Sequence, residues 1–239
     1  MTCILCGSER QTPYCSKPPY EVVRCSGCGF VFATPLPTPA ELEAFYDANG
    51  RAGPFVPKRS AARRRRFRAL LRWVEGFHPP GELLDMGCSQ GELLQAAKEA
   101  DGWEAVGIDL SSPHLDYAAS QGLSVARGTL EQQSYPEGRF DVVTASSILE
   151  HLRDPVASLR EIGRILKPGG IVALVMPCLT HPTARLAGGG WHHINPPNHL
   201  WYFSPQTLAA LLQKAGLRPR QIRCRLLKAE LRAIAEKPA

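Results

Sequence analysis

The chain has 239 residues, of which 44% are hydrophobic and 21% charged, with a formal net charge of +6 at pH 7. These values are typical of a globular protein, and the length allows one full α/β domain with a small appendage. The charge permits a nucleic-acid partner without requiring one. The longest apolar run, 171–176, is far too short to span a bilayer, and no apolar leader opens the chain, so we expect a soluble cytoplasmic protein without membrane segments.

Two Cys-x-x-Cys pairs open the chain, eighteen residues apart. Their members are Cys3, Cys6, Cys25 and Cys28. Two thiolates from each pair can reach one tetrahedral ion, and the spacing is typical of a zinc ribbon. We therefore expect a structural zinc ion within residues 1–34; four unrelated buried thiols are the alternative. Without an export signal, the eight cysteines are expected as metal ligands or free thiols rather than disulfides, and Cys15 as no ligand.

Residues 35–78 are expected to form a helical linker or cap. Three prolines in 34–39 predict a stiff extended stretch, after which Thr38 and Glu41 match a capping box at a helix start. A second helix is predicted over about 60–76, where apolar residues recur at helical spacing. It carries the arginine run Arg63–Arg68, which is either a solvated face or a contact for nucleic-acid phosphates.

From residue 79 to 239, strands and helices alternate. The expected strands are 82–86, 105–109, 125–128, 140–146 and 170–177, followed by a hairpin of 220–227 and 230–236. The expected helices are 91–100, 112–121, 155–166 and 204–215. This alternation predicts a Rossmann-like α/β domain with a parallel sheet and right-handed crossovers.

A glycine loop follows the first of these strands and is the most informative motif. Gly87 and Gly91 let the backbone turn sharply and approach a ligand closely. The dinucleotide pattern Gly-x-Gly-x-x-Gly would need a glycine at position 85, where this chain has Asp85. A carboxylate repels a pyrophosphate but attracts a cationic amino acid end, which favours S-adenosylmethionine over NAD.

The second strand ends in Asp109, which is placed to accept hydrogen bonds from both ribose hydroxyls of a nucleoside. An aspartate at a strand end also often caps the next helix, and this alternative stays open. Leu110 is expected along the adenine face. Thr129 and Leu130, after the third strand, are expected to form the far wall of the adenine pocket.

Four motifs in this order resemble those of class I S-adenosylmethionine-dependent methyltransferases: Asp-Met-Gly-Cys-Ser-Gln-Gly at 85–91, Gly-Ile-Asp-Leu-Ser at 107–111, the segment 140–152, and Ile-Leu-Lys-Pro-Gly-Gly at 165–170. The resemblance implies a seven-stranded sheet in the order 3-2-1-4-5-7-6. It also implies that Asp85, Gly87, Cys88 and Gly91 surround the methionine part of the cofactor. Residues 198–217 resemble the branch that methylates small molecules, several members of which carry a zinc ribbon.

The end of the fourth strand is expected beside the sulfonium, with Ser146 at the cofactor. Glu150 and His151 either line the acceptor pocket or pack and cap the next helix. Certain ubiquinone-pathway O-methyltransferases hold a divalent metal here with a Glu-x-x-Glu-His pattern. This chain has Ser147 in place of the first glutamate, which argues against a catalytic metal.

Residues 188–202 combine three glycines, three histidines, two tryptophans and a tyrosine. We interpret the segment as a lid or a pocket wall, with His193 or His199 as general base because imidazole titrates near neutrality. Alternatively, these histidines hydrogen-bond the loop backbone. Cys88 is interpreted as a packing residue rather than a nucleophile, because displacement at a sulfonium needs no covalent enzyme intermediate.

Three functions remain open. The first is methyl transfer to oxygen, nitrogen or carbon of a small-molecule acceptor. The second is RNA methylation, in which the ribbon and the arginine run contact phosphates. The third is a non-catalytic scaffold that binds the cofactor. The sequence does not identify the acceptor or predict the oligomeric state.

Overall fold

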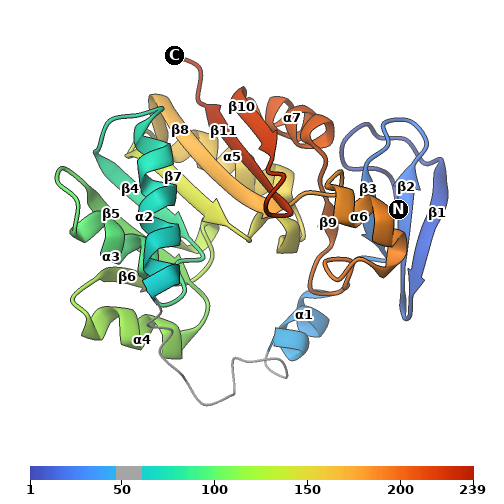
Figure 1. Cartoon of the computed structure of the whole chain (residues 1–239), viewed down its shortest axis with the longest axis horizontal. Coiled ribbons are helices and arrows are strands. Elements are labelled where there is room, and N and C mark those ends of the chain that lie inside the picture. Colours follow the sequence, from blue (N-terminus) through green and yellow to red (C-terminus); the bar gives the residue numbers. More distant parts are fainter. Residues whose placement is uncertain (47–60) are drawn as a thin grey trace.

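A computed structural model of the chain describes residues 1–46 and 61–239, which form two sheets (Figure 1). The smaller sheet has the order β1-β2-β3-β9 and is antiparallel. Its strands are β1 (Gln11–Lys17), β2 (Tyr20–Cys25), β3 (Val31–Thr34) and β9 (Trp201–Tyr202). Because β9 comes from the carboxyl-terminal half, the amino-terminal module is joined to the rest of the protein by a shared sheet.

The larger sheet has seven strands in the order β6-β5-β4-β7-β8-β11-β10. They are β4 (Glu82–Met86), β5 (Glu104–Asp109), β6 (Ser124–Arg127), β7 (Phe140–Ser146), β8 (Leu166–Pro177), β10 (Arg218–Cys224) and β11 (Glu230–Glu236). The strands from β6 to β8 are parallel, and β11 runs antiparallel to both neighbours. Counted within this domain, the order is 3-2-1-4-5-7-6, in an α/β sheet of seven strands.

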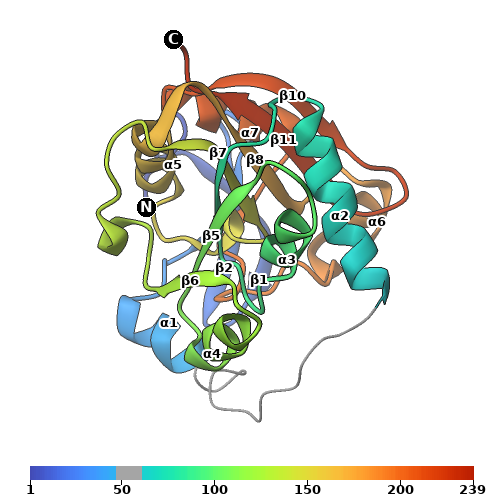
Figure 2. The same cartoon turned by 90° about the vertical axis from the view of Figure 1, so that its left-hand side faces the viewer.

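Helices cover both faces of the larger sheet (Figure 2). The helices are α1 (Pro39–Tyr46), α2 (Ala61–Glu75), α3 (Glu92–Lys98), α4 (Ser112–Ser120), α5 (Pro155–Ile165), α6 (Pro182–Ala187) and α7 (Pro205–Lys214). On one face, Leu70 and Val74 of α2 share a buried cluster with Leu94 of α3. On the other face, Leu159 of α5 and Leu211 of α7 belong to the main core. The parallel strands are therefore buried on both faces, as their apolar sequences require.

Two local details follow from residue chemistry. At α1, the Thr38 N–H donates to Glu41 Oε2 at 2.6 Å and the Glu41 N–H donates to Thr38 Oγ1 at 3.2 Å, which confirms the capping box. β8 begins at Leu166, four residues earlier than expected. Leu166 pairs with Phe140 and Ile171 with Val142, so the intervening turn residues form a bulge within the strand.

The expectation that the cysteines form no disulfide is wrong for one pair: Cys178 and Cys224 are bonded. Cys178 follows β8 and Cys224 ends β10, and the strand between them, β11, pairs with both. This places the two Cα atoms 5.9 Å apart across a sequence separation of 46 residues. Tertiary proximity therefore created a pair that spacing along the chain could not indicate.

Within the described residues, no helix combines the length and the apolar character needed to cross a bilayer.

Candidate functional site

The glycine loop lies at the carboxyl end of β4 and is held against the end of β5. The N–H groups of Gly87 and Cys88 donate to the Ile108 carbonyl at 2.8 and 3.0 Å. Gly87 has φ of 74°, and a Cβ there would lie 2.1 Å from Ile148 Cδ1. The positive φ therefore favours glycine, and the side chain of Ile148, from the segment that follows β7, packs against it.

The other loop residues are fixed by packing. Gly91 has φ of 77°, and a Cβ there would meet Leu123 and Ala118. Cys88 is 3% exposed and packs where Gly107 lacks a side chain, and burial raises the pKa of its thiol well above the ordinary value. A buried, protonated thiol is a poor nucleophile, in agreement with a packing role.

Asp85 is buried below the loop, with 5% of its surface exposed. Thr144 of β7 donates a hydrogen bond of 2.7 Å from its hydroxyl to Asp85 Oδ1. Burial raises the pKa of Asp85 to about 7, assisted by the carboxylates of Asp109 and Glu92 and opposed by the Thr144 bond. A cationic ligand group beside Asp85 would therefore stabilise the ionised form of its carboxyl group. Thr144 was not predicted, because one threonine in an apolar strand gives no sequence signal.

Asp109 joins the glycine loop to the start of α4. Its Oδ2 accepts from the Ser89 N–H and its Oδ1 from the Ser111 N–H, both at 2.9 Å. Ser89 has φ of 49°, a conformation uncommon for a residue other than glycine, and this bond helps to hold it. Ser111 is itself the N-cap residue of α4, and that helix has no side-chain cap hydrogen bond, so Asp109 holds the turn before the helix and does not cap it. Each carboxylate oxygen keeps a further lone pair for a ribose hydroxyl.

The residues expected around adenine differ in exposure. Leu110, directly after Asp109, is 41% exposed, which leaves its side chain available to cover a base. Thr129 is also exposed, and Ser146 is half-buried at the end of β7. Leu130 is fully buried in the main core, so the expectation that it lines the adenine pocket is wrong.

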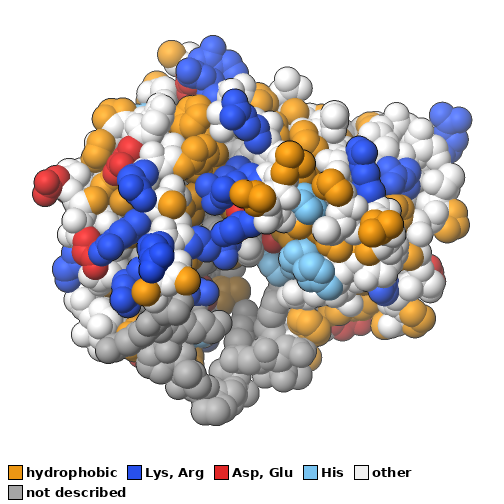
Figure 3. Space-filling model, viewed as in Figure 1, with side chains coloured by type: hydrophobic (Ala, Val, Ile, Leu, Met, Phe, Trp, Pro, Cys, Tyr) orange, Lys and Arg blue, Asp and Glu red, His pale blue; other side chains and the backbone are white. Residues whose placement is uncertain are grey.

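A second group of side chains gathers after β7. Glu150 is 1% exposed, and neither of its carboxylate oxygens has a hydrogen-bond partner. His151 Nε2 lies 3.9 Å from Glu150 Oε1, and the rings of His151 and His199 are 4.7 Å apart. The three ligand atoms that Glu150, His151 and His199 offer lie within 4.8 Å of one another, a set that could hold a metal ion. Figure 3 shows histidines gathered beside a hollow on this face of the molecule.

Burial sets the protonation of this group. It raises the pKa of Glu150 to about 8 and lowers the pKa of His151. Burial also lowers the pKa of His199 to about 4, and that of His193 to about 4, with neighbouring imidazoles adding to the effect. The imidazoles are therefore neutral at pH 7 and keep a lone pair that can bind a cation, while the lowered pKa makes them weaker bases than free imidazole.

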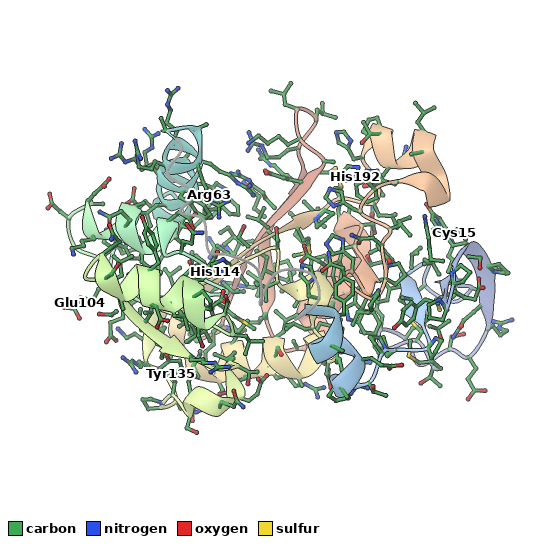
Figure 4. All side chains as sticks on the ribbon, turned by 90° about the horizontal axis from the view of Figure 1, so that it is seen from below. Cys15, Arg63, Glu104, His114, Tyr135 and His192 are labelled. Carbon is green, nitrogen blue, oxygen red and sulfur yellow. A yellow bond between two sulfur atoms is a disulfide. The ribbon has the colours of Figure 1, made fainter. Side chains whose placement is uncertain are left out.

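Residues 188–203 pack into the fold, which favours a fixed segment over a lid. Trp191, Ile194 and Trp201 are each at most 2% exposed. A Cβ at Gly189 would lie 2.4 Å from Cys15 Cβ, so the segment rests directly on β1. Figure 4 labels Cys15 and His192, which lie in the same half of the molecule.

The two Cys-x-x-Cys pairs converge at the end of the smaller sheet. Cys3 Sγ lies 3.6 Å from Cys28 Sγ, and Cys6 Sγ lies 3.5 Å from Cys25 Sγ. All four sulfur atoms lie within 4.8 Å of one another. Tetrahedral zinc with Zn–S bonds of about 2.3 Å separates its sulfurs by about 3.8 Å, which this cluster approximates.

Comparison with solved structures agrees with the fold. A S-adenosylmethionine-dependent methyltransferase from Archaeoglobus fulgidus matches with a TM-score of 0.61 at 21% identity, over 82% of this chain and 99% of that one. The [4+2]-cyclase SpnF matches with a TM-score of 0.64 at 20% identity, over 85% of this chain and 97% of that one. A cyclase among the matches shows that this fold alone does not determine the reaction.

Sequence comparison is more specific. The profile of the methyltransferase domain family matches residues 59–222. The ubiquinone biosynthesis O-methyltransferase of Caulobacter vibrioides is 31% identical over 213 residues, which cover 84% of this chain and 81% of that protein. The chain therefore belongs to the methyltransferase domain family and is an S-adenosylmethionine-dependent methyltransferase.

Proposed function

We propose that this protein transfers the methyl group of S-adenosylmethionine to an oxygen atom of a small-molecule acceptor. The observation that carries the proposal is the juxtaposition of two sites. Through Ile148, which contacts Gly87, the cofactor loop adjoins the segment that holds Glu150 and His151. The similarity of this protein to O-methyltransferases of ubiquinone biosynthesis supports oxygen as the accepting atom.

On the cofactor side, we assign Asp85 to the amino group of the methionine part and Asp109 to the ribose. Gly87, Cys88 and Gly91 form the loop backbone around the methionine part. We place Ser146 at the sulfonium and the base between Leu110 and Thr129, with the buried Leu130 packed beneath them. The exposed Leu110 and the free lone pairs of Asp109 support the nucleoside half of this assignment.

On the acceptor side, methyl transfer to a hydroxyl needs a proton acceptor near the attacking oxygen. His199 is the better placed of the two histidines chosen from sequence, since its ring contacts His151 beside Glu150. His193 lies behind it, with ring centres 5.6 Å apart, and its carbonyl accepts a hydrogen bond from His199 Nδ1 at 2.8 Å. We therefore propose that His151 or His199 receives the proton and that His193 positions His199.

We also propose that Cys3, Cys6, Cys25 and Cys28 bind one structural zinc ion, so that residues 1–34 form a zinc ribbon. Four thiolates fill the tetrahedral sites and leave no open position for water or substrate. The sulfur separations support this role.

The alternative of RNA methylation is not favoured. The arginine run is largely engaged within the fold: Arg63 pairs with Glu92, Arg68 pairs with Glu99, and Arg66 lies 3.5 Å from Glu230. A helix face whose charges are balanced by its own neighbours attracts phosphates weakly.

Incubation with isotope-labelled S-adenosylmethionine and a panel of phenolic acceptors, followed by mass spectrometry, tests the proposal. We expect label in an O-methylated product, and a strong loss of product with Asp109→Ala. Label only in nitrogen- or carbon-methylated products would contradict the choice of oxygen. Label in RNA but in no small molecule would contradict the acceptor class.

A further inference from the structure

The Glu150 carboxylate is an unexplained feature of the fold. It is almost fully buried, and neither oxygen is hydrogen-bonded, although a buried carboxylate without a partner is costly. The chain has a carboxyl group at a position where an amide or an apolar side chain would cost less free energy to bury. An orphaned buried acceptor of this kind indicates a partner that is not part of the polypeptide.

The two adjacent imidazoles are oriented in the manner of metal ligands. His151 Nδ1 lies 2.6 Å from the Asn198 carbonyl oxygen, and His199 Nδ1 lies 2.8 Å from that of His193. A carbonyl only accepts hydrogen bonds, so each Nδ1 must carry the proton. Each Nε2 is then left with its lone pair available. Backbone carbonyls hold metal-binding histidines in this tautomer in many proteins.

The group is also rigid, although its members come from two distant segments. The Leu200 N–H donates to the Glu150 carbonyl at 2.8 Å, and Trp201 Nε1 donates to the Leu152 carbonyl at 2.6 Å. Trp201 is 1% exposed, so this connection is buried. The geometry is therefore fixed before any ligand arrives, which lowers the cost of binding.

We propose that Glu150, His151 and His199 bind one divalent transition-metal cation beside the cofactor loop. Two imidazoles and one carboxylate suit Mn²⁺, Fe²⁺, Co²⁺ or Zn²⁺, and three protein ligands leave coordination positions open. The set differs from the Glu-x-x-Glu-His pattern, because Ser147 replaces the first glutamate and His199 supplies the third donor from the segment after β8.

The position of the cation suggests the class of acceptor. A catechol-like pair of neighbouring oxygens could occupy the open positions, where a cation would lower the pKa of a bound hydroxyl. With the cation bound, His151 and His199 would be ligands, and this lowered pKa would take the place of a histidine base. This second step rests on the proposed O-methyl transfer, whereas cation binding itself does not.

Titration with Mn²⁺, without acceptor or methyl donor, tests the cation site. Mn²⁺ prefers oxygen and nitrogen donors, so it leaves the four thiolates to zinc. We expect one Mn²⁺ per chain by paramagnetic resonance of the free ion. Glu150→Gln and His199→Gln should weaken binding by about 100-fold or more, since even loss of an outer partner costs roughly 10–100-fold. His192→Gln, at an exposed neighbouring histidine outside the cluster, should leave binding unchanged.

Two results would overturn the site: absence of Mn²⁺ and Co²⁺ binding to the wild-type protein at millimolar concentration, or unchanged affinity in both cluster variants. Retained affinity for S-adenosylhomocysteine shows that the variants fold. Methyl transfer to oxygen by a protein that binds no such cation would reject the metal and leave the proposed function standing. Cation binding without methyl transfer to any acceptor would keep the metal site and reject the proposed function.

Discussion

Cofactor binding should depend on the ionisation of Asp85. Its buried carboxyl has a pKa of about 7 in the free protein, where the hydroxyl of Thr144 is its hydrogen-bond donor. Only the carboxylate attracts the cationic amino group of the ligand. Binding at pH 6 must therefore first remove a proton from most molecules, whereas at pH 8 most are already ionised.

The size of the effect follows from that pKa. The ionised fraction is about one tenth at pH 6 and about nine tenths at pH 8, so affinity should rise about tenfold between them. Calorimetry with S-adenosylhomocysteine in two buffers of different protonation enthalpy should detect release of nearly one proton per ligand at pH 6. Asp85→Asn should bind weakly and with little dependence on pH over this range.

Thr144→Val provides a matched control, because it removes the hydrogen bond that stabilises the carboxylate while nearly preserving side-chain volume. The rise in affinity should then move to higher pH. Affinity that stays constant from pH 6 to 8 in the wild-type protein, with no proton released, would refute the assignment of Asp85 to the amino group.

Three further predictions concern separate parts of the protein. Asp109→Ala should weaken S-adenosylhomocysteine binding by about 2 kcal/mol or more in calorimetry, since it removes a charged acceptor, and unchanged affinity would exclude the ribose role. Elemental analysis should find zinc on the four ribbon cysteines, and its removal should increase hydrogen exchange in β9, which pairs with β3, while cofactor binding persists; full protection of β9 in zinc-free protein would contradict this coupling. The folded Glu150 carboxyl keeps its proton up to about pH 8, whereas the unfolded one loses it near 4.5, so its contribution to stability falls as pH rises between these values. Without added metal, Glu150→Gln should therefore raise the free energy of unfolding at pH 8.5 by up to about 5 kcal/mol in urea denaturation, and a lower stability would contradict the burial argument.

The features that sequence predicted well are those encoded locally. Asp85 is the last residue but one of β4 and Asp109 ends β5, and parallel neighbouring strands bring their carboxyl ends to one edge of the sheet. Alternating strand and helix patterns, with glycine at the turns, were sufficient for the α/β class and for the position of the cofactor loop.

The features that sequence missed depend on contacts between distant segments. The Cys178–Cys224 bond required β11 to enter between two strands. The grouping of His199 with Glu150 and His151 spans about fifty residues, and only the fold brings it about. The segment 188–203 resembled a loop in composition, yet its tryptophans are core residues, because a neighbouring module supplies the surface that buries them.

The amino-terminal module has a role beyond its own stability. Phe30, which follows the second cysteine pair, stacks on Trp201 with ring centres 5.8 Å apart and planes 4° from parallel. Trp201 in turn donates its indole N–H to Leu152, two residues after Glu150. Both aromatic side chains are at most 1% exposed, so a continuous buried path connects the cysteine cluster to the acceptor side of the site. Close-packed contacts of this kind transmit displacement rather than absorb it. We therefore expect an amino-terminal module folded around the proposed zinc ion to fix the position of the segment that holds Glu150 and His151, which would explain why a module remote from the glycine loop shares a sheet with β9.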